Sequence, residues 1–296
     1  MSTSTKPPFD PAALPPGTRI ADKYELGPPL GWGKHSVVYE ATHRLLQRKA
    51  AVKILAETDE QTERRFAREA KLAGSLSHAN IVDVYEVGRL PSGHAFLAME
   101  HLAGETLEAR FQRQGPFSIG EAMRIGQELL HGLMAAHEQS IVHRDLRPEN
   151  LFLAQIRGEE VLKILDFGIS RRFGDAADSV LTTPGTLLGE AAYLAPEQLY
   201  EDGVVDHRTD LYATGVLLYR LLTGRLPFEA KASQLLIQIV EKDPPPPSQH
   251  RAELPPDVDK VILSALAKRQ DQRFRDAEAM AEALRLTSLF SDYVTQ

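Results

Sequence analysis

The pattern of apolar and polar residues changes after about residue 101. From residue 20 to that point, short apolar and β-branched runs are separated by turn residues, which predicts β-strands. These runs cover residues 24–30, 36–43, 49–55, 81–88 and 95–99. One stretch differs, and we expect a helix over residues 58–76. Its apolar stripe at helical spacing consists of Phe66, Ala70, Ala73 and Leu76.

The rest of the chain has helical patterning. Ser118 and Glu121 form a capping box, which opens a helix that runs to about Gln139. The prolines at 244–247 require a non-helical connector. Further helices are predicted over residues 209–222, 231–241, 256–268 and 276–286. The chain therefore divides into a small β-rich lobe and a larger α-rich lobe.

The two ends of the chain lie outside these lobes. Five prolines and a Ser/Thr run occupy the first sixteen residues, which predicts an extended, poorly ordered tail over residues 1–19. We expect the small lobe to span residues 20–101 and the larger lobe residues 102–287, followed by a short extension over 288–296.

Composition excludes several classes of site. The 296 residues include no cysteine, which rules out disulfides, thiolate nucleophiles, iron–sulfur clusters and cysteine-based zinc sites. The ten histidines show no metal-binding spacing. A formal net charge of −7 argues against nucleic acid as a partner. Residues 1–20 lack the apolar core of a secretory signal, and no run reaches the roughly eighteen apolar residues of a membrane span. We expect a soluble, cytoplasmic protein.

A glycine-rich turn lies between the first two predicted strands, in Leu30-Gly31-Trp32-Gly33 and the residues up to Val38. Glycine lets backbone N–H groups approach phosphate oxygens without a Cβ in the way. An ordinary hairpin explains the same residues, so this turn by itself leaves both interpretations open.

A lysine lies inside the apolar strand run that follows. Alternation puts Ala51 and Lys53 on the same face of that strand. Lys53 could shield a sheet edge, or it could point at phosphates beside a small alanine that admits a flat base. Glu69 lies on or beside the apolar stripe of the predicted helix, where a lone carboxylate is costly unless it is paired. A buried Lys53–Glu69 ion pair would explain both placements.

Two further motifs carry acids and an amide suited to phosphate chemistry. His143-Arg144-Asp145 is followed by Asn150 and an apolar strand run, and Asp166-Phe167-Gly168 comes after a second run. Asp145 is suited to act as a base for a substrate hydroxyl, while Asn150 and Asp166 offer the hard oxygen ligands that Mg²⁺ prefers.

Taken in order, these motifs resemble the catalytic domain of the eukaryotic-like (Hanks-type) Ser/Thr protein kinases of bacteria. The resemblance covers about residues 20–287 and includes Ala195-Pro196-Glu197. It implies an α+β, bilobal protein-kinase fold, with a small antiparallel β-sheet lobe that carries one key helix and a larger, mainly α-helical lobe.

The resemblance also assigns roles to single residues. Asp145 would be the catalytic base, assisted by Lys53, Arg147 and Asn150, and Asn150 and Asp166 would bind Mg²⁺. Met99 would precede a hinge formed by Glu100 and Leu102, whose backbone binds adenine. The implied ATP-binding residues are Leu30, Gly31, Gly33, Val38, Ala51, Lys53, Glu69, Met99, Glu100 and Leu102. The implied structural residues are Glu190, Glu197, Asp210 and Arg273. Among these, Glu197 would pair with Arg273, and Asp210 would brace the catalytic loop.

The chain departs from the family pattern at a few positions. Ser36 replaces the third glycine of the turn, and Pro28 and Pro29 predict a short or bulged first strand. Arg147 stands where Ser/Thr kinases usually carry lysine, and Glu190 where they usually carry threonine. Because the family places these two positions together at Asp145, we hypothesise that Arg147 bridges Glu190 and Asp145. In the alternative, Glu190 points to solvent and Arg147 merely replaces lysine.

The implied function is transfer of the γ-phosphate of Mg-ATP to Ser or Thr hydroxyls of proteins, in signalling. Arg144 before the catalytic Asp145 implies activation by phosphorylation of the loop after residue 168, with Thr182, Thr183 and Thr186 as candidate sites. Autophosphorylation would be favoured by a homodimer. The altered pair leaves an alternative open, which is a pseudokinase or nucleotide-binding scaffold with little or no phosphotransfer.

Overall fold

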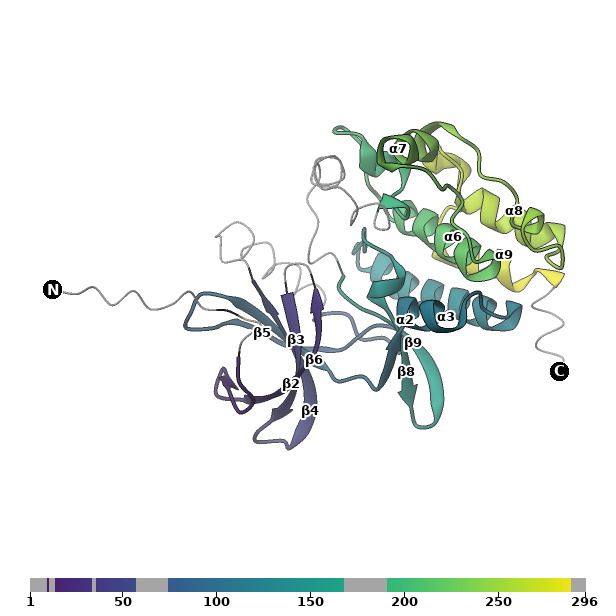
Figure 1. The fold of residues 1–296 in the computed structure, drawn as a ribbon. Coiled ribbons are helices and arrows are strands. Elements are labelled where there is room, and N and C mark those ends of the chain that lie inside the picture. Colours follow the sequence, from purple (N-terminus) through teal and green to yellow (C-terminus); the bar gives the residue numbers. More distant parts are fainter. Residues whose placement is uncertain (1–9, 11–13, 34–35, 57–73, 168–190, 289–296) are drawn as a thin grey trace. The chain divides into compact units, whose positions relative to one another are not determined.

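The computed structural model describes residue 10 and residues 14–33, 36–56, 74–167 and 191–288. The chain forms two compact units (Figure 1). The first contains Met1–Ser77 and Val82–Ala103, and the second contains His78–Ile81 and Gly104–Gln296. The predicted α+β class, with an antiparallel sheet in one part and mainly helices in the other, is confirmed.

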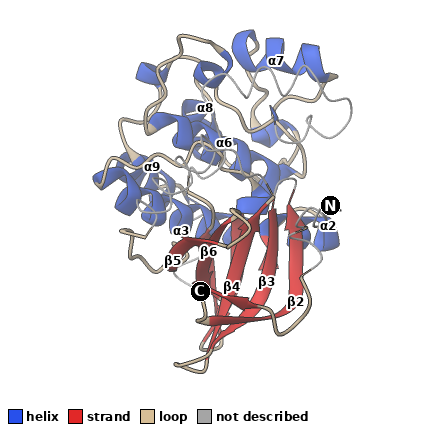
Figure 2. Ribbon diagram, turned by 90° about the vertical axis from the view of Figure 1, so that its left-hand side faces the viewer, coloured by secondary structure: helices blue, strands red, loops and turns tan. Residues whose placement is uncertain are grey.

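The first unit is built on a six-stranded antiparallel sheet with the strand order β1-β2-β3-β4-β6-β5 (Figure 2). The strands are β1 (Arg19–Ile20), β2 (Tyr24–Gly33), β3 (Ser36–His43), β4 (Arg48–Leu55), β5 (Val84–Arg89) and β6 (Ala95–Glu100). The β2–β3 register shifts on both sides of Pro29, so the bulge expected at the two prolines is present.

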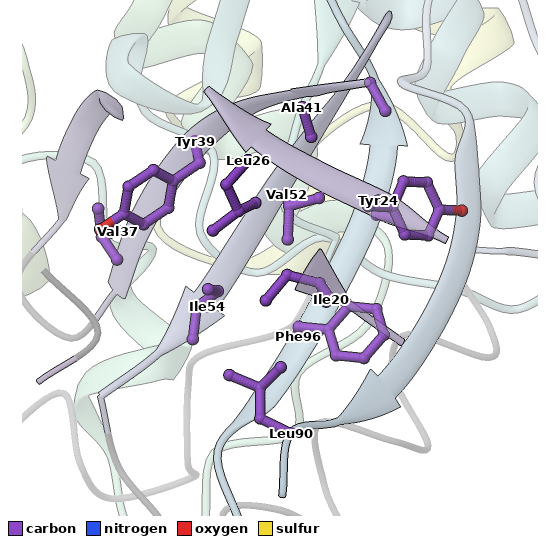
Figure 3. Packing of buried hydrophobic residues seen from close by; sticks show 12 residues of the cluster. Ile20, Tyr24, Leu26, Val37, Tyr39, Ala41, Val52, Ile54, Leu90 and Phe96 are labelled. Atoms are coloured by element: carbon purple, nitrogen blue, oxygen red, sulfur yellow. The ribbon is translucent and has the colours of Figure 1, made fainter. Parts of the chain in front are cut away.

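One face of this sheet carries the core of the first unit. Alternate residues of β3, β4 and β6 point to that face, where they meet side chains of β1 and β2 (Figure 3). The core of the first unit includes Ile20, Tyr24, Leu26, Val37, Tyr39, Val52, Ile54, Leu90 and Phe96. Because side chains alternate along a strand, the residues between these core positions lie on the opposite face of the sheet.

Two expectations for the first unit are wrong in part. The tail predicted for residues 1–19 is too long, because Gly17 N donates to Leu26 O (2.7 Å) and Leu14 packs on the core. The strand expected from Ile81 begins only at Val84, since Ile81 belongs to the second unit, where it forms a parallel bridge with Ile164. Residues 58–73 of the helix expected over residues 58–76 lie outside the described residues, and residues 74–76 are not helical, with a turn at 74 and 75.

The second unit combines a small antiparallel sheet, in the order β7-β8-β9, with helices. The strands are β7 (Gly104–Thr106), β8 (Leu151–Ile156) and β9 (Glu159–Ile164). The helices are α2 (Leu107–Gln114), α3 (Ile119–Glu138), α6 (Arg208–Thr223), α7 (Ala232–Glu241), α8 (Pro256–Ala265) and α9 (Ala277–Arg285). Short 3-10 turns span Pro148–Asn150, Pro196–Leu199, Pro247–Gln249 and Gln270–Gln272.

Helix α6 is the centre of this unit, because it is buried along almost its whole length and packs against α3 and α8. The capping box at Ser118 is confirmed, since its hydroxyl accepts a hydrogen bond from Glu121 N and its backbone N–H donates to the Glu121 carboxylate. The helices predicted after residue 200 agree with α6, α7 and α9 within one residue, but α8 ends at Ala265, three residues early.

Strand β7 and helix α2 were not predicted from the sequence. Strand β7 has only three residues and depends on Gly104, whose φ is 142° and whose absent Cβ would strike Leu153 O. Helix α2 starts where the Thr106 hydroxyl accepts a hydrogen bond from Ala109 N (3.1 Å). Within the described ranges, no helix has both the length and the apolar character needed to cross a membrane.

Candidate active site

The predicted nucleotide-binding residues of the first unit share one face of its sheet. Val38 pairs with Lys53 across β3 and β4, and Ala51 pairs with Met99 across β4 and β6. Residues paired in this way point to the same side, and it is the side opposite the core. Gly31 pairs with Val38 and so falls on the same row. The register thus gathers five of the implied ATP residues on one surface.

The glycine-rich strand leaves room for a ligand. A Cβ added to Gly31 would meet no atom within 4 Å, so packing inside the protein does not require glycine there. A phosphate group bound to this strand would need open space beside the backbone. The glycine at position 31 leaves that space, so the strand fits a bound phosphate. Leu30 is 50% exposed on the same strand. Gly33 lies close to Ser36, whose hydroxyl would be 2.9 Å from a Cβ at that position.

The implied hinge begins at the last pair of the β4–β6 ladder, Ala50 with Glu100. Glu100 N also donates to Asp83 O at 2.9 Å, which fixes the start of the hinge against the chain before β5. Leu102 follows in non-regular backbone. Glu69 lies outside the described residues, so the Lys53–Glu69 pair stays a prediction.

In the second unit, the buried carboxylate of Asp210 holds the catalytic loop. Its two oxygens accept hydrogen bonds from His143 N and Arg144 N, each at 2.8 Å, and His137 Nε2 lies 2.9 Å from Oδ2. Burial would raise the pKa of Asp210, but the His137 hydrogen bond, the nearby His143 and the Arg144 amide lower it below its usual range. The carboxylate therefore stays ionised and binds the loop backbone directly before Asp145.

His143 connects the loop to the segment that bears Asp166. Its Nε2 lies 2.8 Å from Leu165 O, and its Nδ1 lies 3.3 Å from Asp145 N. Because a carbonyl oxygen can only accept, Nε2 carries the hydrogen, and Nδ1 then accepts from the Asp145 amide. The ring also packs edge-on against Phe167, with centroids 4.9 Å apart. The buried His143 ring therefore contacts the backbone of Asp145 and both residues that flank Asp166.

Asn150 is oriented toward the proposed base. Its Nδ2 donates to Asp145 O at 2.8 Å and to Asp145 Oδ2 at 3.1 Å. With the amide nitrogen used in this way, the amide oxygen remains as a possible metal ligand. Asn150 O also accepts from Leu165 N at 2.8 Å, which ties Asn150 to the chain just before Asp166.

The donor set fits magnesium better than a transition metal. The described residues contain no group of three or more His, Asp or Glu side chains placed to hold a metal ion. One carboxylate and one amide oxygen suit a hard cation that keeps several waters and phosphate oxygens in its shell.

Arg144 and Asp166 both have positive φ, 68° and 55°, which is uncommon for residues other than glycine and is typical of functional loops.

Arg147 has an ion-pair partner that the sequence did not indicate. Its Nε lies 3.0 Å from Glu149 Oε2, and its side chain is 18% exposed. Glu190 lies outside the described residues, and so do Gly168 and the candidate phosphosites Thr182, Thr183 and Thr186. The hypothesis that Arg147 bridges Glu190 and Asp145 therefore stays a prediction.

The predicted pair of Glu197 and Arg273 is present and buried. Arg273 Nη1 and Nη2 donate to Glu197 Oε1 and Oε2, each at 2.8 Å, which is a bidentate geometry. Thr209 Oγ1 also donates to Glu197 Oε1 at 2.7 Å. The remaining Arg273 donors bind backbone carbonyls, including Ala267 O and Arg208 O. The Glu197 carboxylate and the Arg273 guanidinium therefore find their hydrogen-bond partners within the second unit.

Two further links were missed from the sequence. Gln198 accepts from Ala195 N at 3.0 Å and donates to Arg144 O at 2.8 Å, so it joins the catalytic loop to the segment after residue 190. Arg220 Nη1 donates to Tyr193 OH at 2.7 Å and to Glu108 Oε2 at 2.6 Å. Burial raises the pKa of Tyr193, which keeps its hydroxyl neutral as the acceptor. No spacing rule could have found the two Arg220 contacts, because Tyr193 and Glu108 lie 27 and 112 positions away from Arg220.

Comparison with known proteins gives consistent matches over this whole arrangement. A family model described as "Protein kinase domain" matches residues 24–284. Serine/threonine-protein kinase pkn3 of Myxococcus xanthus is 38% identical over 276 residues, which are 90% of this chain and 50% of that protein. Serine/threonine-protein kinase PknB of Mycobacterium tuberculosis is 37% identical over 270 residues, which are 89% of this chain and 42% of that protein.

A solved structure shares the fold. The crystal structure of a mutant form of the Mycobacterium tuberculosis PknI kinase domain superimposes with a TM-score of 0.72 at 26% identity. The alignment covers 95% of this chain and 99% of that one. The chain spans about half the length of the curated relatives it matches, between 42% and 50%.

The buried pair predicts a strong effect on stability. Arg273→Ala should lower the free energy of unfolding by about 3–5 kcal/mol, because it leaves the Glu197 charge buried without its partner. Thermal and urea unfolding would measure this. Arg269→Ala is the matched control, since Arg269 pairs with Asp271 on the surface, where its side chain is 71% exposed. Equal melting temperatures for the two variants would contradict the prediction.

Proposed function

The chain belongs to the protein kinase domain family, and from this premise we propose that it transfers the γ-phosphoryl group of Mg-ATP to Ser or Thr hydroxyls of protein substrates. The observation that carries the proposal is the catalytic loop in the second unit. Asp145, Asn150 and the chain before Asp166 are held together there by His143 and the buried Asp210. Such an assembly is suited to phosphoryl transfer, which depends mainly on positioning and electrostatics.

In the proposed reaction, Asp145 orients the substrate hydroxyl and accepts its proton at a carboxylate oxygen. The hydroxyl oxygen forms a bond to the γ-phosphorus, and the bond between that phosphorus and the β–γ bridging oxygen breaks, which releases ADP. Lys53 and Arg147 would stabilise negative charge on the phosphates, and Asn150 and Asp166 would hold Mg²⁺ through their side-chain oxygen atoms. The metal supplies charge neutralisation on the phosphate oxygens when it is bound.

No described residue favours the alternative of a non-catalytic scaffold. Lys53, Asp145, Asn150 and Asp166 are all present in the sequence, and the hydrogen bonds of Asp145 and Asn150 suit an active loop. We place the domain in signalling and in the cytoplasm, where its ATP substrate is available. We also propose that two copies of the chain meet during autophosphorylation.

Phosphotransfer should depend on two residues from different units. Asp145→Ala and Lys53→Met should each lower incorporation of labelled γ-phosphate by about 10²–10⁴-fold, because each removes a group that acts on the reacting atoms. Lys23→Met is the control, since Lys23 forms a surface ion pair with Glu86 and is 52% exposed. Incorporation by Asp145→Ala equal to that of the unaltered chain would overturn the proposed function.

Gly31 provides a test that separates binding from folding. Gly31→Ala should leave the melting temperature unchanged, because a Cβ there meets no atom within 4 Å. The same methyl group should raise the KM for ATP by about fivefold or more, because it intrudes on bound phosphates. Gly104→Ala is the reverse control and should lose stability, because its φ is 142° and its Cβ strikes Leu153 O. An unchanged KM for Gly31→Ala would show that the phosphates bind elsewhere.

We propose that the chain phosphorylates its own activation loop. A phosphate on Thr182 or Thr183 would add roughly −1.5 to −2 charges and attract Arg144. Peptide mass mapping after incubation with Mg-ATP should find phosphate on these residues or on Thr186, and Asp145→Ala should carry none. An active enzyme with no phosphate between Ser170 and Ala192 would refute this prediction.

The departures at Arg147 and Glu190 are proposed to be a matched pair. A second carboxylate beside Asp145 would repel it, whereas the planar guanidinium of Arg147 is able to hold two carboxylates. Arg147→Lys and Glu190→Thr should each impair phosphotransfer, and the double change should recover part of the loss. A strictly additive double-mutant cycle would reject the coupling. Arg147→Lys also weakens the contact with Glu149, so Glu149→Gln is the required control.

A further inference from the structure

We propose that Glu40 and His101 form a brace that positions the hinge backbone for the nucleotide base. The hinge here is the segment Glu100–Leu102, which begins at the last residue of β6. The proposal rests on the proposed function, because it concerns how that site binds its nucleotide. Both residues act through the backbone of the hinge, so they are positioning residues and not catalytic ones.

The brace consists of one carboxylate shared by two side chains. His101 Nε2 lies 3.5 Å from Glu40 Oε2, and Lys49 Nζ lies 3.3 Å from Glu40 Oε1. The His101 and Glu40 side chains are only 17% and 29% exposed, whereas that of Lys49 is 64% exposed. The contact with His101 is therefore the better shielded of the two, and it is the one that reaches the hinge.

The sheet register places the brace directly beside the expected base-binding surface. Glu40 pairs with Ala51 across β3 and β4, and Ala51 pairs with Met99 across β4 and β6. These three residues therefore form one row on the face opposite the core. Ala51 is the small residue expected beside a flat base. Glu40 is the immediate neighbour of Ala51 in that row, so it lies next to the expected base-binding surface.

His101 is the first residue beyond the ladder. The β4–β6 pairs end at Ala50 with Glu100, and residues 101–103 have no regular secondary structure. On the side of β5, Glu100 N is held by Asp83 O at 2.9 Å. On the side of β3, the brace holds the next residue through its ring. The hinge backbone is thus fixed from both sides at the point where the ladder stops supporting it.

Fixing a short backbone segment before the ligand arrives lowers the entropy cost of binding. It does not change the groups that act on the γ-phosphate, since neither side chain of the brace belongs to that set. The brace should therefore affect nucleotide affinity and the KM for ATP, and it should leave the rate at saturating ATP unchanged. A merely structural role would instead lower stability and all kinetic parameters together.

The test measures Mg-ADP binding and steady-state phosphotransfer on the full 296-residue chain. Glu40→Leu and His101→Ala should each raise the Kd for Mg-ADP and the KM for ATP by about two- to fivefold, with an unchanged rate at saturating ATP. Glu40→Gln keeps an oxygen acceptor and should lose less. The double variant Glu40→Leu/His101→Ala should bind no more weakly than the weaker single variant.

Glu86→Gln is the matched control, because Glu86 is 27% exposed, lies in the same sheet and forms an ion pair with Lys23 away from the hinge. It should bind Mg-ADP as the unaltered chain does. Thermal unfolding checks each variant, and where Glu40→Leu fails to fold, Glu40→Gln and His101→Asn replace the Leu and Ala changes.

Two results would overturn the brace alone. One is a Kd for Mg-ADP that is unchanged in both single variants, and the other is a fall in the saturated rate at constant KM. Multiplying losses in the double variant would show that Glu40 and His101 act independently, which also rejects the proposal. If the unaltered chain bound no Mg-ADP, the proposed function itself would fail, and that outcome is distinguishable because it appears before any substitution.

Discussion

The catalytic loop depends on one buried charge, the carboxylate of Asp210. An ionised group inside a protein is costly unless hydrogen bonds satisfy it. Asp210 receives two backbone N–H groups of the loop and the ring of His137, so its desolvation is offset only when the loop has its observed course. The position of Asp145 follows from this constraint, since it comes directly after the anchored backbone, and Asn150 then donates to Asp145 through its side-chain amide.

Other charged side chains of the second unit are also satisfied by specific hydrogen-bond partners. Glu197 and Arg273 satisfy each other and tie the segment after residue 190 to the end of α8 and its following turn. Arg220 connects α6, α2 and Tyr193 of the same segment. Each of these charges is held by partners from distant parts of the chain. The segment after residue 190 is thereby held by buried polar contacts rather than by apolar packing alone.

The first unit uses a different principle. Its strands bury one face in an apolar core, and the pairing register then dictates which residues share the other face. Val38, Ala51, Lys53 and Met99 are brought together because antiparallel partners point to the same side. A shift of one residue would move all of them into the core face. Here the hydrophobic effect selects the register, and the register positions the residues proposed to bind the nucleotide.

The sequence by itself determined the family and the α+β class, predicted most of the described helices and strands other than β7 and α2, and named the residues proposed to carry the chemistry. Its motifs are local, and short-range spacing specifies a capping box, a glycine-rich strand or the loop around Asp145. The tertiary structure decided which distant groups meet. The Glu149 partner of Arg147 and the Glu40 partner of His101 leave no periodic signal, and neither does the contact of Arg220 with Tyr193. A polar side chain can satisfy its charge with any suitable partner, and only the folded backbone brings one particular partner within reach.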